Sequence, residues 1–154
     1  MNKKKQYENG EYIGELKNNL REGKGIMYFN NKNIYEGEWN NDKAEGKGIF
    51  CFENGDRYEG EIKNDKAEGK GTFYYKNGDR YEGEIKKNKF DGKGVFFWKD
   101  GDRYEGDFKN DKKEGKGIYY YYNGDREMGD YLNGKKIGKH VKLNKDGIVL
   151  TTNY

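Results

Sequence analysis

The sequence predicts an all-β protein: an elongated, single-layer antiparallel sheet of tandem 23-residue β-hairpins, open and twisted into a trough. Three observations support this prediction. The 154-residue chain repeats with a constant spacing, contains 24 Gly and no Pro, and carries 15 Tyr, 8 Phe and 2 Trp. Leu, Ile, Val and Phe make up about 16% of the chain, below the ~20% level under which disorder is the first expectation, so an ordinary closed core is not expected. The many aromatic residues and the small net charge of +3 argue against simple disorder.

The repeat is visible in its tyrosines, which recur every 23 residues at Tyr12, Tyr35, Tyr58, Tyr81 and Tyr104. Residues 58–80 read YEGEIKNDKAEGKGTFYYKNGDR. The repeats are expected at 12–34, 35–57, 58–80, 81–103 and 104–126. Terminal units of a repeat array are usually atypical. We therefore interpret 1–11 as a partial N-terminal strand or cap, and 127–154 as a degenerate sixth repeat with a C-terminal cap.

The repeated Y-E-G-E/D, G-K-G and G-D-R segments resemble the MORN (membrane occupation and recognition nexus) repeat family. The resemblance covers residues 12–126 without an insertion or deletion. It departs from the family at Leu16, Ile62, Ile85 and Phe108, where the family prefers Trp and only Trp39 keeps it. The resemblance implies an elongated single-layer antiparallel sheet curled into an open trough. It also implies a module that holds a peptide or helix of a partner protein.

Each repeat is expected to form one antiparallel hairpin, joined edge to edge with the next. Residues 58–62 alternate between apolar or small residues and glutamates, which is typical of a strand with one polar face. Residues 71–75 are the second predicted strand, and 63–69 are predicted to be a polar loop. Asn77 and Gly78 predict a hairpin turn because both residues tolerate positive φ.

The alternation along the strands places aromatic residues on one face, where rings are expected to cover glycines. The other face is predicted to carry a ladder of Glu and Lys. Two interpretations of the rings stay open: they are the core of the sheet, or they also line a groove for a protein segment, since exposed apolar patches mark binding sites. The predicted groove residues are Tyr35, Trp39, Phe50, Phe52, Tyr58, Phe73, Tyr75, Tyr81, Phe96, Trp98, Tyr104, Tyr119 and Tyr121.

Anionic phospholipid or phosphoinositide binding is the alternative function, because the family name implies a membrane role. The four intact repeats carry a combined net charge of −2, so only the two ends of the chain are basic. Lysines near a membrane surface each contribute about 1 kcal/mol of attraction to anionic lipid. The candidate lipid-binding residues are Lys3, Lys4, Lys5, Lys135, Lys136, Lys139, Lys142 and Lys145.

The C-terminal residues predict a self-association edge. Ile148, Val149, Leu150 and Thr151 form an uncharged run of high strand propensity, and free strand edges pair unless charge or a covering segment prevents it. An end-to-end homodimer is one interpretation of this run. The other is that it folds back as a cap on the fifth repeat.

Catalysis, cofactors and metals are not expected. His140 has no neighbouring catalytic partner in the sequence and is interpreted as a surface residue, while Cys51 is interpreted as a small apolar replacement. The Gly-Asp-Arg turns are expected to form ion pairs and turn bonds. Without a continuous positive stripe, nucleic-acid binding is not expected. We expect a cytoplasmic protein, which leaves open a peripheral position at a membrane or at the cytoskeleton.

Overall fold

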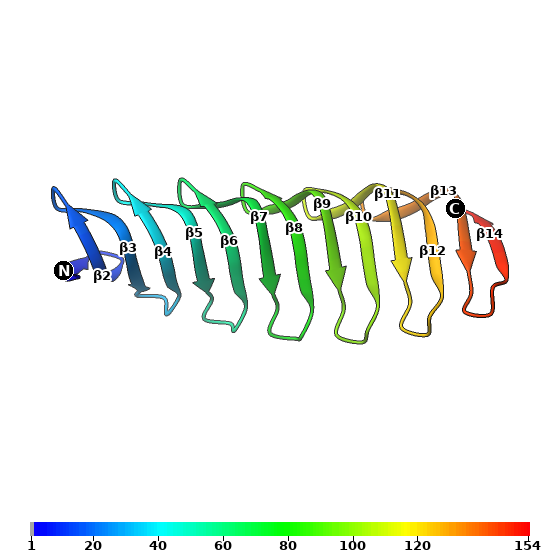
Figure 1. Ribbon diagram of the computed structural model, residues 1–154, viewed down its shortest axis with the longest axis horizontal. Coiled ribbons are helices and arrows are strands. Elements are labelled where there is room, and N and C mark those ends of the chain that lie inside the picture. The colour runs from blue at the N-terminus through cyan, green and yellow to red at the C-terminus, as the bar shows by residue number, and fades with distance from the viewer. Residues whose placement is uncertain (1) are drawn as a thin grey trace. The chain divides into compact units, whose positions relative to one another are not determined.

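The computed structural model describes residues 2–154, and the chain divides after Lys76 into two compact units. In the first unit every strand pairs antiparallel with the next one along the chain (Figure 1). Its strands are β1 (Lys3–Tyr7), β2 (Gly10–Lys17), β3 (Leu20–Phe29), β4 (Ile34–Asn40), β5 (Lys43–Cys51), β6 (Arg57–Lys63) and β7 (Lys66–Tyr74).

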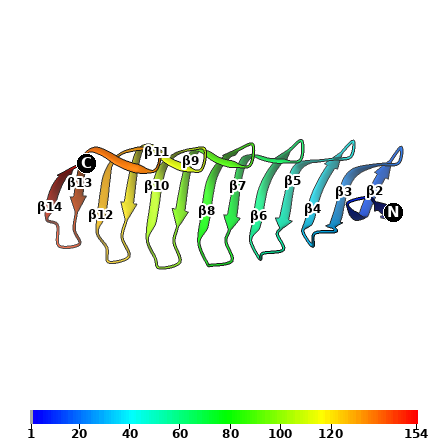
Figure 2. The ribbon, with the colours of Figure 1, turned by 180° about the vertical axis from the view of Figure 1, so that it is seen from behind.

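The second unit has the same antiparallel order. Its strands are β8 (Arg80–Lys86), β9 (Lys89–Phe97), β10 (Arg103–Lys109), β11 (Lys112–Tyr120), β12 (Arg126–Leu132), β13 (Lys135–Leu143) and β14 (Val149–Asn153). Figure 2 shows from behind that each unit is a single layer of strands. The predicted all-β, open antiparallel fold is confirmed. None of residues 2–154 forms a helix of the length and hydrophobicity that a membrane crossing requires.

The predicted polar loop at 63–69 is wrong, because only its second and third residues turn the chain. Asn64 and Asp65 have φ of 48° and 62°, as a two-residue type I′ hairpin turn requires. Strand β7 begins directly afterwards at Lys66. A β-bulge between Gly60 and Ile62 lets the glycine-containing segment stay in the sheet. The polar composition of 63–69 therefore reflects one solvated face of a hairpin rather than a loop.

The longer turns are closed by a bond between their ends, as in the turn after β5. The Phe52 N–H donates to the Asp56 carbonyl at 2.9 Å, and Gly55 has a φ of +93°. The first repeat forms the same turn without the glycine: Lys32 takes the equivalent place with a φ of +65°. Positive φ costs a lysine more than a glycine, so the surrounding turn bonds impose this conformation.

The core of each unit is a row of tyrosines lying on a row of glycines. In the first unit the register aligns Gly14, Gly25, Gly37, Gly48, Gly60 and Gly71 across neighbouring strands. The buried Tyr58 ring covers two of them. A Cβ at Gly71 would lie 2.5 Å from Tyr58 Cε2, and one at Gly60 would lie 2.4 Å from its hydroxyl oxygen. That hydroxyl donates to the Glu61 carbonyl at 2.8 Å. The predicted packing of rings on glycines is confirmed.

His140 performs the tyrosine's role in the last hairpins, so its interpretation as a surface residue is wrong. Its side chain is 1% exposed and covers Gly129, where a Cβ would lie 2.3 Å from the imidazole Cδ2. Its Nε2 lies 2.9 Å from the carbonyl of Asp130. One repeat earlier, the carbonyl of Asp107 accepts the hydrogen bond of the Tyr104 hydroxyl in the same way. Glu127 stands at the tyrosine position of this repeat on β12, and the His140 ring on β13 takes the place of the missing tyrosine ring.

We predict that Gly71→Ala lowers the free energy of unfolding by about 1–3 kcal/mol, the usual cost of overpacking a filled site. The added methyl group would overlap the Tyr58 ring. Urea denaturation measures the change, with Lys70→Ala on the neighbouring exposed position as the control. In a Tyr58→Ala background the cost of Gly71→Ala should fall, since the overlapping ring is gone. An equal cost in both backgrounds would contradict ring-on-glycine packing.

Candidate functional site

The structure divides the predicted groove residues into a buried and a half-exposed set. Five rings lie at most 5% exposed and pack within the sheet: Tyr35, Trp39, Tyr58, Tyr81 and Tyr104. They form the core and offer a partner little surface. The half-exposed rings lie nearer the longer turns: Phe50, Phe52, Phe73, Tyr75, Phe96, Trp98, Tyr119 and Tyr121. Their role in binding a protein stays a prediction.

In the first unit the half-exposed rings form a continuous row. Phe29, which was not among the predicted groove residues, begins it with its centroid 5.9 Å from that of Phe50. Phe50 and Phe52 are 4.6 Å apart, and Phe52 lies 5.7 Å from Phe73. Tyr75 continues the row at 4.7 Å from Phe73. Such tilted ring pairs stabilise each other by about 0.5–1.5 kcal/mol beyond the area that they bury.

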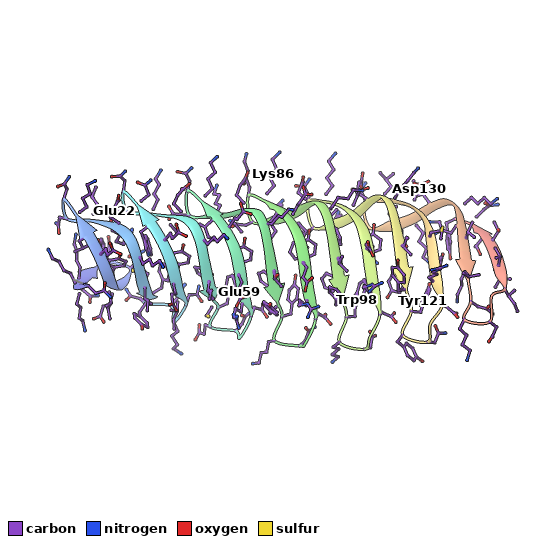
Figure 3. The ribbon with its side chains drawn as sticks, in the orientation of Figure 1. Glu22, Glu59, Lys86, Trp98, Tyr121 and Asp130 are labelled. Atoms are coloured by element: carbon purple, nitrogen blue, oxygen red, sulfur yellow. The ribbon has the colours of Figure 1, made fainter. Side chains whose placement is uncertain are left out.

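The second unit has a row of the same construction. Phe96 and Trp98 are 4.7 Å apart, Trp98 and Tyr119 5.2 Å, and Tyr119 and Tyr121 4.8 Å. Trp98 and Tyr121 lie toward the longer turns (Figure 3). Tyr119 donates its hydroxyl to Asp102 at 2.6 Å. Burial, followed by the hydrogen bond to Glu127, raises the pKa of Tyr121 to about 12, so this hydroxyl stays protonated at neutral pH.

Lys113 on β11 places a cationic group against this second row. Its Nζ lies 4.7 Å from the ring centroids of both Trp98 and Tyr119, and 4.8 Å from that of Tyr104. Burial is the main cause that lowers the pKa of Lys113 to about 8, and the nearby Lys136 lowers it further. The sequence analysis missed this residue. The available signal was that lysine stands here where Phe90, Ala67 and Ala44 stand one, two and three repeats earlier.

Glutamates on the opposite face mainly hold the backbone of the bulges. Glu61 accepts the backbone N–H of Lys70 at 3.1 Å, and Glu38 accepts that of Lys47 at 3.2 Å. The register also sets Lys47 opposite Glu61, as the predicted ladder requires. These carboxylates accept hydrogen bonds from main-chain donors, which explains why an acidic residue recurs at this position of each repeat.

The Gly-Asp-Arg turns connect successive repeats. Asp56 accepts the backbone N–H of Lys76 at 2.9 Å, and Asp79 accepts that of Lys99 at 2.9 Å. The predicted turn bonds are therefore confirmed. The arginines stack on aromatic rings of the same face: the Arg103 guanidinium lies 4.1 Å from the Tyr120 centroid. Repetition of these contacts marks them as structural.

Several of the candidate lipid-binding lysines have partners within the protein. Lys4 pairs with Glu11 at 2.9 Å, and Lys5 donates to the carbonyl of Asn19 at 2.7 Å. Lys136 pairs with Glu127 at 2.7 Å, and Lys142 with Asp125 at 2.9 Å. Lys3, Lys135 and Lys139 pair through the strand register, and within residues 2–154 their side chains form no ion pair or hydrogen bond. Lys145 contributes its backbone N–H to Asp125.

The predicted self-association edge forms a strand. Strand β14 pairs with β13, where Val149 lies opposite Leu143 and Leu150 lies opposite Lys142. The side chains of Ile148, Val149 and Leu150 are more than half exposed. Tyr154 also acts as a cap, because its ring lies 5.0 Å from His140 and its hydroxyl donates to Glu127. Strand β14 thus pairs with β13, Tyr154 contacts residues that follow the fifth repeat, and the self-association interpretation stays a prediction.

The titratable groups of the described residues do not form a recognisable catalytic or metal site. His140 Nδ1 lies 3.2 Å from Glu127 without the geometry of a hydrogen bond. Burial alone would raise the pKa of Glu127, but hydrogen bonds from Lys136 and Tyr121 outweigh it and lower this pKa. Within residues 2–154, no group of three or more His, Cys, Asp or Glu side chains could hold a metal ion.

Comparison with known proteins agrees with this architecture. The MORN repeat profile matches residues 12–34, 35–57, 58–80, 81–103 and 104–126. The search of curated proteins gives no match. Among solved structures, the chain is similar to the TCP domain of Drosophila melanogaster SAS-4 (dCPAP), solved in complex with a proline-rich motif of Ana2 (dSTIL). That likeness has a TM-score of 0.51 and 15% identity, and covers 86% of this chain and 84% of that one.

A second similar structure is the TCP10 domain of Danio rerio CPAP in complex with a peptide of Danio rerio STIL. Its TM-score is 0.33 at 13% identity, with coverage of 99% of this chain and 84% of that one. The likeness to the SAS-4 domain, at 15% identity and a TM-score of 0.51, indicates the fold alone. The five consecutive repeats, by contrast, span three quarters of the sequence, and they show that the chain belongs to the MORN repeat family.

Proposed function

We propose that this protein is a non-catalytic scaffold whose rows of half-exposed rings bind an extended segment of a partner protein. The observation that carries the proposal is the row itself: in each unit neighbouring rings lie about 5–6 Å apart on one face of a single-layer sheet. Aromatic side chains dominate the binding energy of protein interfaces. The rings that the sheet needs for its own core are the buried tyrosines, so the half-exposed row is available for a partner.

A proline-rich segment is the partner chemistry that we favour. The SAS-4 domain of similar fold was solved with a proline-rich motif. Extended proline-rich segments bind in aromatic-lined grooves because their backbone is already ordered before binding. The tilted rings of Phe52, Phe73 and Tyr75 provide a continuous apolar surface against which proline rings can pack. The anionic-lipid alternative is less well supported, since four of its eight lysines pair within the protein.

We predict that a fluorescein-labelled decaproline peptide binds the full chain and that Trp98→Ala or Phe73→Ala weakens binding about fivefold or more. Loss of a ring at an interface commonly costs at least about 1 kcal/mol. Fluorescence anisotropy measures the affinity. Tyr74→Ala is the matched control, because Tyr74 neighbours Phe73 and its ring lies on the opposite face with Arg57.

Two results would contradict the peptide-binding proposal. Equal binding of a labelled (Gly-Ser)5 peptide would show that the protein does not recognise proline rings. Unchanged affinity in both ring variants would move the binding site away from the rows. Sedimentation of the protein with phosphoinositide-containing liposomes, but no peptide binding, would favour the lipid alternative instead.

We also propose that the β14 edge joins two copies of this chain. Three adjacent apolar side chains, Ile148, Val149 and Leu150, are 54–61% exposed, and β13 pairs with one edge of β14. An uncharged strand edge is suited to antiparallel pairing with its own copy. The β1 edge contains Lys3, Lys4 and Lys5, whose like charges oppose the equivalent contact.

Light scattering of the full chain tests the β14 contact. We predict that the parent chain dimerises as its concentration is raised to about 100 μM, which corresponds to an interface worth about 5–6 kcal/mol. The Val149→Lys variant should remain a monomer over the same range. Leu132→Lys is the control, because Leu132 is 48% exposed on β12 and lies outside the edge. A monomeric parent chain, or a Val149→Lys variant that remains dimeric, would exclude this interface.

A further inference from the structure

Four aromatic rings surround Lys113: one each from β10, β11 and β12, and that of Trp98, which follows the end of β9. Its Nζ lies 4.7–4.8 Å from the centroids of Trp98, Tyr104 and Tyr119, and 5.7 Å from that of Tyr131. The register sets Lys113 opposite Phe108, on the ring-bearing face. An ammonium group is attracted to ring faces by roughly 0.5–2 kcal/mol, which holds this side chain across the row instead of extending it into solvent.

Lys113 has no carboxylate partner among the described residues. The equivalent lysine of the next repeat, Lys136, is 2.7 Å from Glu127, and the equivalent arginine of the first, Arg21, is 3.1 Å from Asp42. The carboxylate of Asp102 accepts from the Tyr119 hydroxyl and from the backbone N–H of Tyr122. Of the three basic residues at this repeat position, Lys113 is therefore the one without an ion pair among the described residues; the charge of Asp102 acts on it without forming an ion pair.

A second donor close to Lys113 also lacks an acceptor. Tyr131 is 3% exposed, and its hydroxyl has no hydrogen-bond partner within the described part of the chain. A buried polar group without a partner costs about 1–3 kcal/mol. The charged groups that act on this hydroxyl are Lys136 and Glu127, so Lys113 is the donor of this region that an incoming acceptor with negative charge would satisfy.

We propose that Lys113 forms an anion subsite within the ring row of the second unit that binds an Asp or Glu carboxylate of the partner segment. This inference rests on the proposed function and specifies the chemistry of the partner: an acidic residue within an otherwise apolar segment. A carboxylate carries one negative charge and matches one unpaired ammonium group. A phosphate, at about −1.5 to −2, would leave excess charge among the rings.

Phenylacetate and its neutral isostere phenylacetamide are suitable probes, because they share a ring and differ in charge. NMR of the full chain with 13C-labelled lysine follows each ε-carbon as either probe is added at constant ionic strength. We expect phenylacetate to shift the Lys113 signal and to bind about tenfold more tightly than phenylacetamide, since hydrogen bonds to charged groups contribute about 1.5–3 kcal/mol. Lys113→Met should abolish this preference, whereas Lys112→Met, at the exposed neighbouring position, should retain it.

The preference should also depend on pH. An amine with a pKa of about 8 is mostly protonated at pH 7 and mostly neutral at pH 9.5, so the advantage of phenylacetate should disappear over that range. The other titratable groups around Lys113 are Asp102, Lys136, Tyr104, Tyr119 and Tyr131. Burial raises the pKa of each of these three tyrosines, so they remain neutral up to pH 9.5.

Equal affinity for the two probes, or a preference that survives Lys113→Met, would overturn the subsite. Absence of phenylacetate binding up to about 50 mM would overturn it as well. None of these three results would affect the proposed peptide groove, which the decaproline experiment tests through Trp98 and Phe73. Conversely, a phenylacetate preference that requires Lys113, without decaproline binding, would support the subsite and reject a proline-rich partner.

Discussion

The contact between the tyrosine rings and the glycine rows constrains the rest of this fold. A single-layer sheet has no second layer to cover its apolar face, so each repeat must supply both sides of its own core. The glycines provide the space, because a Cβ at Gly48 would lie 2.4 Å from Tyr35 Cε2. The tyrosine ring then lies flat enough for its hydroxyl to reach the backbone carbonyl three residues later, as in Tyr35 and Glu38. Both features are required together.

Hydrogen bonds between turns explain why the weaker repeats still fold. In the first repeat Asn33 replaces the turn aspartate and accepts the Glu53 backbone N–H at 2.9 Å, just as Asp56 accepts that of Lys76. At the other edge Asp65 accepts the Ala44 N–H at 2.8 Å. These bonds connect residues about 20 apart, so each turn is positioned by a neighbouring repeat. A residue with a poor intrinsic preference, such as Lys32, can therefore be accommodated.

Much of the fold followed from the sequence, since a period of 23 residues with alternating polarity restricts the chain to repeated hairpins. The error at 63–69 arose because a bulge changes the alternation: Gly60 faces Gly71 and Ile62 faces Ala67, so residues two apart on β6 face residues four apart on β7. His140 was misjudged for a different reason. Its neighbours Gly129 and Asp130 lie on β12, and the replacement of a ring by one from the next strand has no local sequence pattern.

The exposure of the aromatic residues was also beyond sequence reasoning, since alternation places Tyr58 and Phe73 on the same face without distinguishing them. The register pairs these two residues, yet only the tyrosine is buried. The tyrosine lies over glycines, whereas Phe73 lies beside other rings near the turn. How deeply a ring is buried on this face therefore depends on whether glycines or other side chains lie beneath it. The candidate site consists of the rings that have no glycine to cover.

The repeat position occupied by Lys113 shows how such a fold can vary its binding chemistry without losing its core. Successive repeats carry Arg21, Ala44, Ala67, Phe90, Lys113 and Lys136 here, each next to the turn and opposite a core residue. Phe90 stacks on Tyr81 with centroids 3.6 Å apart, so the position contacts the tyrosine but is not fixed by the glycine row. Substitution here changes the charge and volume beside the rings, while the contact that maintains the sheet stays the same.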